Sequence, residues 1–160
     1  MSKILVAYFS KTGEQYSVGN ITEGNTAIVA KIIAQKTGGD LFEIKVADDN
    51  YPNKYTPLVK FAKEEKQKNV RPEIVGKVVN WADYDTIFVG YPNWWADMPM
   101  PVYTFLESYD FSDKKIYNFC THEGSGGVHN SDFAMYGHVA QNDRENADRQ
   151  VAEWLRDLNY

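Results

Sequence analysis

Three apolar runs, at residues 4–9, 86–90 and 116–120, each lead directly into a loop of unusual composition. A continuous run such as residues 4–9 is typical of a strand that is buried on both faces of a parallel sheet. Parallel strands end at the same edge of their sheet, so we expect the three loops to lie near one another. The sequence therefore predicts one ligand site, built from segments that are far apart along the chain.

The segments between these runs carry helix signals and weaker strand signals. Four segments are predicted to be helices, from apolar spacing, a charged face or a proline in a first turn: 25–36, 58–68, 101–108 and 144–158. Two are predicted to be short strands: 41–46 and 137–140. Strands that alternate with helices indicate an α/β fold of three layers, a doubly wound parallel sheet covered on both faces. Right-handed crossovers place its ligand crevice at the carboxyl ends of the strands.

Length, charge and cysteine content exclude several classes of protein. The chain of 160 residues is long enough for one domain with a real core, and we expect a single domain over residues 1–160. A net charge of -5 and a pI near 5.2 disfavour a nucleic-acid partner. No apolar stretch approaches the about 20 residues that span a bilayer, so no membrane partner is expected. With no signal-peptide pattern and Cys120 as the only cysteine, we expect a cytoplasmic location.

The loop after the first run offers hydroxyl groups and ends at the start of a helix. Ser10 and Thr12 follow the run, and Gly24, Asn25 and Thr26 stand where the helix begins. A helix N-terminus supplies unpaired amides and a favourable dipole, and glycine lets the backbone come close to a ligand, so this loop suits a phosphate. The alternative is that Asn25 or Thr26 only caps the helix.

The loop after the second run holds two adjacent tryptophans between prolines. Trp94 and Trp95 each have a large area to bury, and a loop at the rim of a sheet gives them little core to fill. A flat ligand is therefore a natural partner for one of the two rings, because successive side chains usually point in different directions. The alternative is that both rings pack under a neighbouring loop or form a dimer contact.

The loop after the third run, residues 122–127, contains serial glycines. Gly-Ser-Gly-Gly at 124–127 can aim backbone amides at the polar edge of a planar ligand, or it can form a flexible turn. His122 is placed either to border that ligand or to be held by ordinary hydrogen bonds. Cys120 is expected to be a small buried hydrophobe rather than a nucleophile.

One kind of small molecule suits all three loops, a planar aromatic ring that carries a phosphate. We therefore predict flavin mononucleotide, FMN, as the cofactor. Asp97 and Glu123 lie near the expected ring, where a carboxylate would disfavour negative charge on the reduced ring and lower its reduction potential. Since the cofactor performs the electron chemistry, no catalytic residue of the chain and no metal site are predicted.

At these residues the chain resembles the flavodoxin superfamily. A Tyr-Pro-x-Trp-Trp motif stands at 91–95 and a Thr-His-x-Gly-Ser-Gly motif at 121–126, and the likeness covers nearly the whole chain. The resemblance implies a five-stranded sheet in the order 2-1-3-4-5, with FMN bound non-covalently by the loops after strands one, three and four. The loops and the resemblance together predict these FMN-binding residues: Ser10, Thr12, Asn25, Thr26, Pro92, Asn93, Trp94, Trp95, Thr121, His122, Gly124, Ser125, Gly126 and Gly127.

The phosphate loop departs from the flavodoxin pattern. That loop is usually compact in flavodoxins, whereas here residues 10–13 are separated from 24–26 by an interposed segment, residues 14–23. We expect the segment to loop out so that the two halves converge; the alternative is that one half has lost its role. Tyr16, within the segment, is a candidate to close over the cofactor.

The function favoured by the sequence is an FMN-binding electron-transfer flavoprotein, with redox proteins or small quinone-like acceptors as partners. The alternative is an FMN-dependent NAD(P)H:quinone oxidoreductase, similar to the Trp-repressor-binding-protein branch of the superfamily. A phospho-acceptor receiver domain shares the strand order, but it needs an acidic residue where this chain has Tyr91 and Pro92. A serine hydrolase is disfavoured because Ser125 lacks the glycine two positions earlier that a nucleophile elbow requires.

Overall fold

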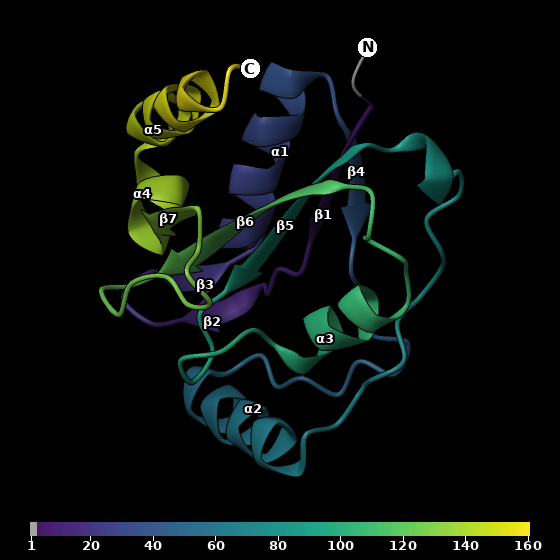
Figure 1. The fold of residues 1–160 in the computed structure, drawn as a ribbon. Coiled ribbons are helices and arrows are strands. Elements are labelled where there is room, and N and C mark those ends of the chain that lie inside the picture. Colours follow the sequence, from purple (N-terminus) through teal and green to yellow (C-terminus); the bar gives the residue numbers. More distant parts are fainter. Residues whose placement is uncertain (1–2) are drawn as a thin grey trace.

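A central sheet with helices on both faces organises residues 3–160, the part of the chain that this computed structural model describes (Figure 1). The strands of the sheet are β1 (Ile4–Tyr8), β4 (Asp40–Glu43), β5 (Thr86–Pro92), β6 (Lys115–His122) and β7 (Phe133–Tyr136). A separate hairpin consists of β2 (Gly13–Gln15) and β3 (Gly19–Ile21). The helices are α1 (Asn25–Thr37), α2 (Tyr55–Lys68), α3 (Met100–Glu107), α4 (Gly137–Asn142) and α5 (Arg144–Asp157), and a short 3-10 helix spans Trp81–Asp83.

The order of the strands confirms the predicted fold class. The sheet runs β4-β1-β5-β6-β7, and each neighbouring pair is parallel. Counted along the chain without the hairpin, this order is 2-1-3-4-5. The winding direction reverses between β1 and β5, so the carboxyl ends of these two strands face the crevice where a doubly wound fold binds its ligand.

Alternate residues of β1 show why the apolar runs are continuous. Val6 and Tyr8 pack in the layer that contains α1, α4 and α5, whereas Leu5 and Ala7 pack in the layer that contains α2 and α3. Figure 1 shows these two helical layers on opposite sides of the sheet. Both faces of the strand are therefore buried, and neither face can be polar.

The packing of the neighbouring strand β6 requires glycine at position 90 in β5. A Cβ atom built on Gly90 would lie 2.1 Å and 2.2 Å from two ring atoms of Phe119 in β6. Phe119 is fully buried in the layer of α1 and α5, so its ring has no open space into which it can move. The ring therefore occupies the volume that a side chain at position 90 would need.

The last strand lies four residues before its predicted place. Residues 137–140, predicted to be a strand, belong to helix α4, and the strand is Phe133–Tyr136. A segment of four residues is too short for its periodicity to distinguish a strand from a helix. The choice is made by tertiary contacts, since Phe133 stacks on Trp154 with ring centroids 4.8 Å apart. The carboxylate of Glu123 also accepts a hydrogen bond from the backbone N–H of His138 in the first turn of α4.

Two further observations concern Cys120 and the helices. Cys120 in β6 is buried, and burial raises the pKa of its thiol to about 11, so the expectation of a small buried hydrophobe is confirmed. Of the helices formed by residues 3–160, none combines the length and the apolar character needed to cross a membrane.

Candidate functional site

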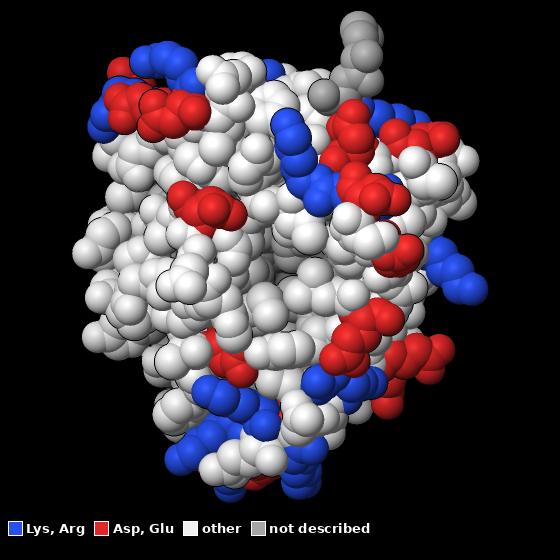
Figure 2. Space-filling model, in the orientation of Figure 1, with Lys and Arg blue, Asp and Glu red and all other residues white. Residues whose placement is uncertain are grey.

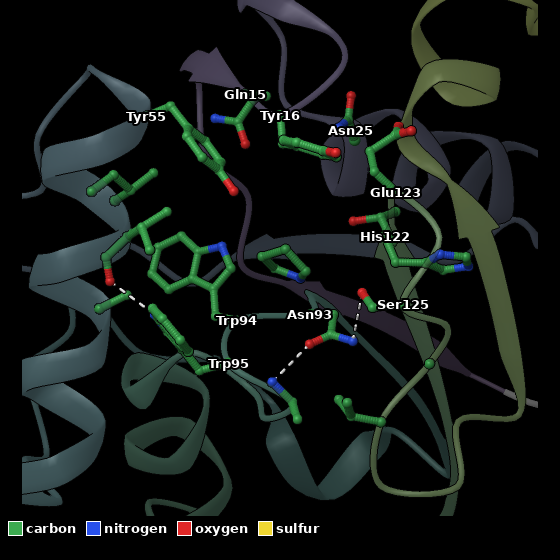
Figure 3. Close-up of a pocket in the computed structure, with 18 residues that line it drawn as sticks. Gln15, Tyr16, Asn25, Tyr55, Asn93, Trp94, Trp95, His122, Glu123 and Ser125 are labelled. Atoms are coloured by element: carbon green, nitrogen blue, oxygen red, sulfur yellow. Dashed lines mark hydrogen bonds between the residues drawn. The ribbon is translucent and has the colours of Figure 1, made fainter.

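A cavity of about 610 Å³ lies at the carboxyl edge of the sheet. Its wall is formed by the hairpin, the start of α1, one face of α2, and the loops after β5 and β6 (Figure 3). This volume is in the range of small-molecule and cofactor sites. Several of the residues predicted to bind FMN line it: Asn25, Pro92, Asn93, Trp94, Trp95, Thr121, His122, Ser125 and Gly127.

The start of α1 lies against the loop after β1. The hydroxyl Oγ of Ser10 accepts a hydrogen bond from the N–H of Ala27 at 3.0 Å. A Cβ atom at Gly24 would lie 1.9 Å from that oxygen, so glycine is needed for this approach. Ser10, which precedes the interposed segment, therefore contacts the start of α1, which follows that segment. Thr12 is exposed, and Ser10, Thr12 and Thr26 all lie outside the cavity lining.

Asn25 and Thr26 have different environments although they are adjacent. Asn25 lines the cavity, and among the described residues its buried Oδ1 atom has no hydrogen-bond partner. The side chain of Thr26 is buried, and its Oγ1 lies 2.7 Å from Oγ1 of Thr121 in β6. Thr26 thus joins the helix to the sheet through its side chain and can offer a ligand only its backbone.

The interposed segment forms the hairpin β2–β3, which stands beside the start of α2. The N–H of Glu14 donates to the carbonyl of Asn53 at 2.8 Å, and the carboxylate of Glu14 accepts from the N–H of Tyr55 at 2.6 Å. The rings of Tyr16 and Tyr55 lie 5.7 Å apart, and both residues line the cavity. The hairpin and the first turn of α2 therefore form one rim.

Trp94 packs on the apolar core at its base. Its ring makes edge contacts with Phe9 at 5.2 Å and with Tyr51 at 5.6 Å, measured between ring centroids. Figure 3 shows the indole projecting toward the open centre of the cavity. Trp94 thus offers a flat apolar surface at the cavity wall.

Trp95 lies instead against α2. Its indole N–H donates to the carbonyl of Val59 at 2.8 Å, and the ammonium of Lys63 lies 5.1 Å from the ring centroid. Its backbone is left-handed, with φ of 57°, a conformation that costs a non-glycine residue about 1–2 kcal/mol. This turn directs the two tryptophans to different neighbours, as expected for successive side chains.

Asn93 joins the second loop to the third. Its Nδ2 donates to the carbonyl of Gly126 at 2.9 Å and to Oγ of Ser125 at 3.3 Å. Its Oδ1 accepts from the N–H of Ala96 at 3.0 Å (Figure 3). The tryptophan turn and the glycine-rich loop therefore hold each other in place at the cavity wall.

In the glycine-rich loop, two glycines have conformations that other residues rarely adopt. Gly124 has φ of 111° and Gly126 has φ of 79°. Neither belongs to the cavity lining, and the N–H of Gly124 donates to Nδ1 of His122 at 3.0 Å. Of the predicted glycine-loop donors, Ser125 and Gly127 are the ones that reach the cavity.

His122 supplies the imidazole of the lining and Glu123 supplies its carboxylate. Burial lowers the pKa of His122, opposed by Glu123 and aided by His138, so its imidazole is neutral at pH 7. Glu123 pairs with Nδ1 of His138 at 2.7 Å. Asp97, expected near the ligand ring, lies outside the lining and accepts from the hydroxyl of Tyr103 at 2.6 Å. Of these two carboxylates, Glu123 is therefore the one placed to lower the reduction potential of a bound ligand.

The wall contributed by α2 was missed in the sequence. Leu58, Val59 and Ala62 form an apolar face of the helix, and this spacing does not reveal whether such a face packs on the sheet or borders a cavity. Within residues 3–160 no group of His, Cys, Asp and Glu could hold a metal ion. Besides Tyr16 and Glu123, the lining residues outside the predicted FMN-binding set are Gln15, Tyr55, Leu58, Val59, Ala62, Ala96 and Val128.

Comparison with known proteins gives a family and a set of similar structures. The family model described as flavodoxin matches residues 3–143. A candidate flavoprotein of Bacteroides eggerthii is 28% identical with a TM-score of 0.72, over 100% of this chain and 99% of that one. A flavoprotein of Lactobacillus acidophilus, solved in complex with FMN, is 24% identical with a TM-score of 0.64, over 78% of each chain. An NAD(P)H:quinone oxidoreductase of Methanothermobacter marburgensis shares the fold at 16% identity and a TM-score of 0.51, over 100% of this chain and 98% of that one. A search of the curated proteins finds no significant match.

Proposed function

The chain belongs to the flavodoxin family, and from that premise we propose that it is an FMN-binding flavoprotein that transfers electrons between redox partners. When bound, FMN supplies one- and two-electron chemistry, while the protein binds it and adjusts its potential. The observation that carries the proposal is the convergence of three loops on one cavity, with hydrogen-bond donors at one end and an indole face at the other. Redox proteins or small quinone-like acceptors are the proposed partners.

The residues at the start of α1 fit the phosphate of FMN. The first turn of a helix offers unpaired N–H groups and a favourable dipole, and Asn25, the first residue of α1, lines the cavity. The amide of Asn25 has a buried polar atom without a partner in the described chain, and rotation of this amide presents its NH₂ to an anion. Since the cavity lining contains no Lys or Arg within residues 3–160, neutral donors and the helix dipole would hold the phosphate.

The other end of the cavity fits the ring of FMN. Trp94 provides an apolar face, and the loop of residues 122–127 provides polar groups at the opposite wall (Figure 3). Neutral His122 has Nε2 available as a donor because its Nδ1 accepts from Gly124. Glu123 adds negative charge, which would disfavour a negatively charged reduced ring and lower the reduction potential.

The first test is the absorption spectrum of the purified protein. We expect a yellow protein that releases FMN on denaturation, because the cavity is large enough for the cofactor and preformed. The released flavin is identified by chromatography against FMN and riboflavin standards. Colourless protein that fails to take up added FMN would contradict the proposal.

Replacing each tryptophan in turn tests which one contacts the ring. Trp94→Leu is expected to weaken FMN binding about tenfold, because base–aromatic stacking of this kind contributes about 1–3 kcal/mol. Trp95→Leu serves as the matched control and is expected to change the affinity less than about threefold, since its ring lies on α2. Dissociation constants come from fluorescence titration of the apoprotein with FMN. A larger loss with Trp95→Leu would reverse the assignment.

An FMN-dependent NAD(P)H:quinone oxidoreductase is the second candidate. Exposed aromatic side chains at the cavity mouth favour it, because a second planar molecule can approach the cofactor there. Steady oxidation of NADPH with a quinone by the purified protein alone would support the enzyme. Reduction that occurs only through a separate reductase would support the electron carrier.

A further inference from the structure

Three exposed aromatic side chains border the mouth of the cavity. Tyr16 is 58% exposed, Trp95 42% and Tyr55 37%, and all three line the cavity. They come from the hairpin, the loop after β5 and the first turn of α2. Large apolar groups that stay exposed beside a pocket mark a surface for binding, and flat rings favour a flat ligand.

Helix α2 places positive charge beside Trp95, one of these three side chains. Val59, Lys63 and Lys66 lie on one helical face, and Trp95 covers that face. Lys63 lies over the Trp95 ring, and Lys66 donates a hydrogen bond to the Trp95 carbonyl. Neither lysine pairs with a carboxylate of residues 3–160. Figure 2 shows blue side chains gathered at the bottom of the molecule, where Figure 1 places α2.

The acidic side chains around the mouth are held by donors within the protein. A carboxylate that already accepts internal hydrogen bonds repels an anionic ligand less than a free one does. The lysines of α2 therefore place positive charge beside Trp95, in a chain whose net charge is -5. The internal partners are the Tyr55 N–H for Glu14, Lys31 and Arg144 for Glu23, His129 for Asp97, and His138 for Glu123.

We propose that the mouth of the cavity docks a planar aromatic anion, a ring that carries a sulfonate, carboxylate or phosphate group, as the molecule that exchanges electrons with the cofactor. The ring lies on the wall made by Tyr16, Tyr55 and Trp95, and the anionic group lies beside Lys63 and Lys66. This inference rests on the proposed function, because it requires bound FMN.

The test compares two acceptors that share a ring but differ in charge. Photoreduced holoprotein is mixed without oxygen with a naphthoquinone sulfonate or with neutral menadione in a stopped-flow instrument. Each acceptor takes two electrons and two protons from the reduced holoprotein and ends as the hydroquinone. The return of flavin absorbance gives a rate constant for each, and the quantity compared is the ratio of the sulfonate rate constant to the menadione rate constant.

The double substitution Lys63→Met/Lys66→Met keeps the aliphatic stems and removes both charges. We expect the ratio to fall about tenfold, in keeping with the loss of two charge contacts near the surface. In the wild type the ratio should also fall as salt is raised, because salt screens exposed charges. The matched control is Lys77→Met/Lys115→Met, which removes the same charge at exposed residues that make no contact with Trp95 and should leave the ratio unchanged.

A ratio that falls equally in both double variants, or in neither, would overturn the docking proposal and leave FMN binding in place. An acidic redox protein as the true occupant would give this second result, an unchanged ratio. Protein that takes up no FMN would overturn both the docking proposal and the proposed function, and this failure is visible in the spectrum before any acceptor is added.

Discussion

Replacing Asn25 by Asp is expected to weaken FMN binding about 100-fold, because it places a second negative charge near the phosphate. A pair of like charges about 4 Å apart near a protein surface costs up to about 4 kcal/mol, and 100-fold corresponds to about 2.7 kcal/mol. The cavity lining has no Lys or Arg within the described residues to offset that charge. Riboflavin, which has no phosphate, should lose less than about threefold in affinity. Both dissociation constants are measured by titrating the apoprotein.

Asn20→Asp is the matched control for this experiment. Asn20 lies on the exposed strand β3, so the same change in net charge is made outside the cavity lining. We expect its FMN affinity to match that of the wild type. Equal losses of FMN and riboflavin in Asn25→Asp would place Asn25 beside another part of the cofactor and contradict its role at the phosphate.

Replacing Gly90 by Ala is expected to lower the free energy of unfolding by about 3 kcal/mol, because a methyl group enters space that the Phe119 ring fills. Gly90 pairs with both neighbours of β5, so the strand cannot shift without breaking two ladders. Urea unfolding, followed by circular dichroism with FMN absent, measures the change. An Ala variant as stable as the wild type would show that the Phe119 ring moves away at little cost.

A second substitution separates the steric clash from other effects of alanine. Phe119→Leu removes the ring atoms nearest to position 90 and on its own should cost about 1–2 kcal/mol. The double variant Gly90→Ala/Phe119→Leu should be more stable than the sum of the two losses predicts, because the clash is absent. Strict additivity would exclude Phe119 as the cause.

The parallel sheet, and the edge of it at which the cavity lies, could be predicted from local features of the sequence. Residues 4–9 and 86–90 are continuously apolar because both faces of β1 and β5 are buried, and parallel strands must bring their following loops to one edge. This rule requires no knowledge of side-chain contacts. It was sufficient to predict that residues 93–98 and 122–127 lie near the start of α1.

Side-chain direction within the site could not be predicted, because contacts between distant segments decide it. Whether Trp94 or Trp95 faces the cavity depends on the left-handed backbone of Trp95 and on its bond to Val59. The sequence gives no local signal for that bond. We predicted that Thr12 binds the phosphate because it is close to Ser10 in the sequence. The chain turns into the hairpin there and leaves Thr12 exposed.

The α2 wall and the last strand were missed for a related reason. Leu58, Val59 and Ala62 form an ordinary apolar helix face, and only the neighbouring loop shows that part of this face lines a cavity. Residues 133–140 are short and weakly periodic, so their division into β7 and α4 depends on packing against Trp154 and α1.

The hairpin β2–β3 has both of its ends in the same place, since Gly13 is paired with Ile21. Because its two ends are adjacent, this hairpin can be lengthened, shortened or replaced without distorting the central sheet. Grafting a different ribbon between these two positions is thus a direct route to a new choice of acceptor, with the cofactor end of the protein left as it is.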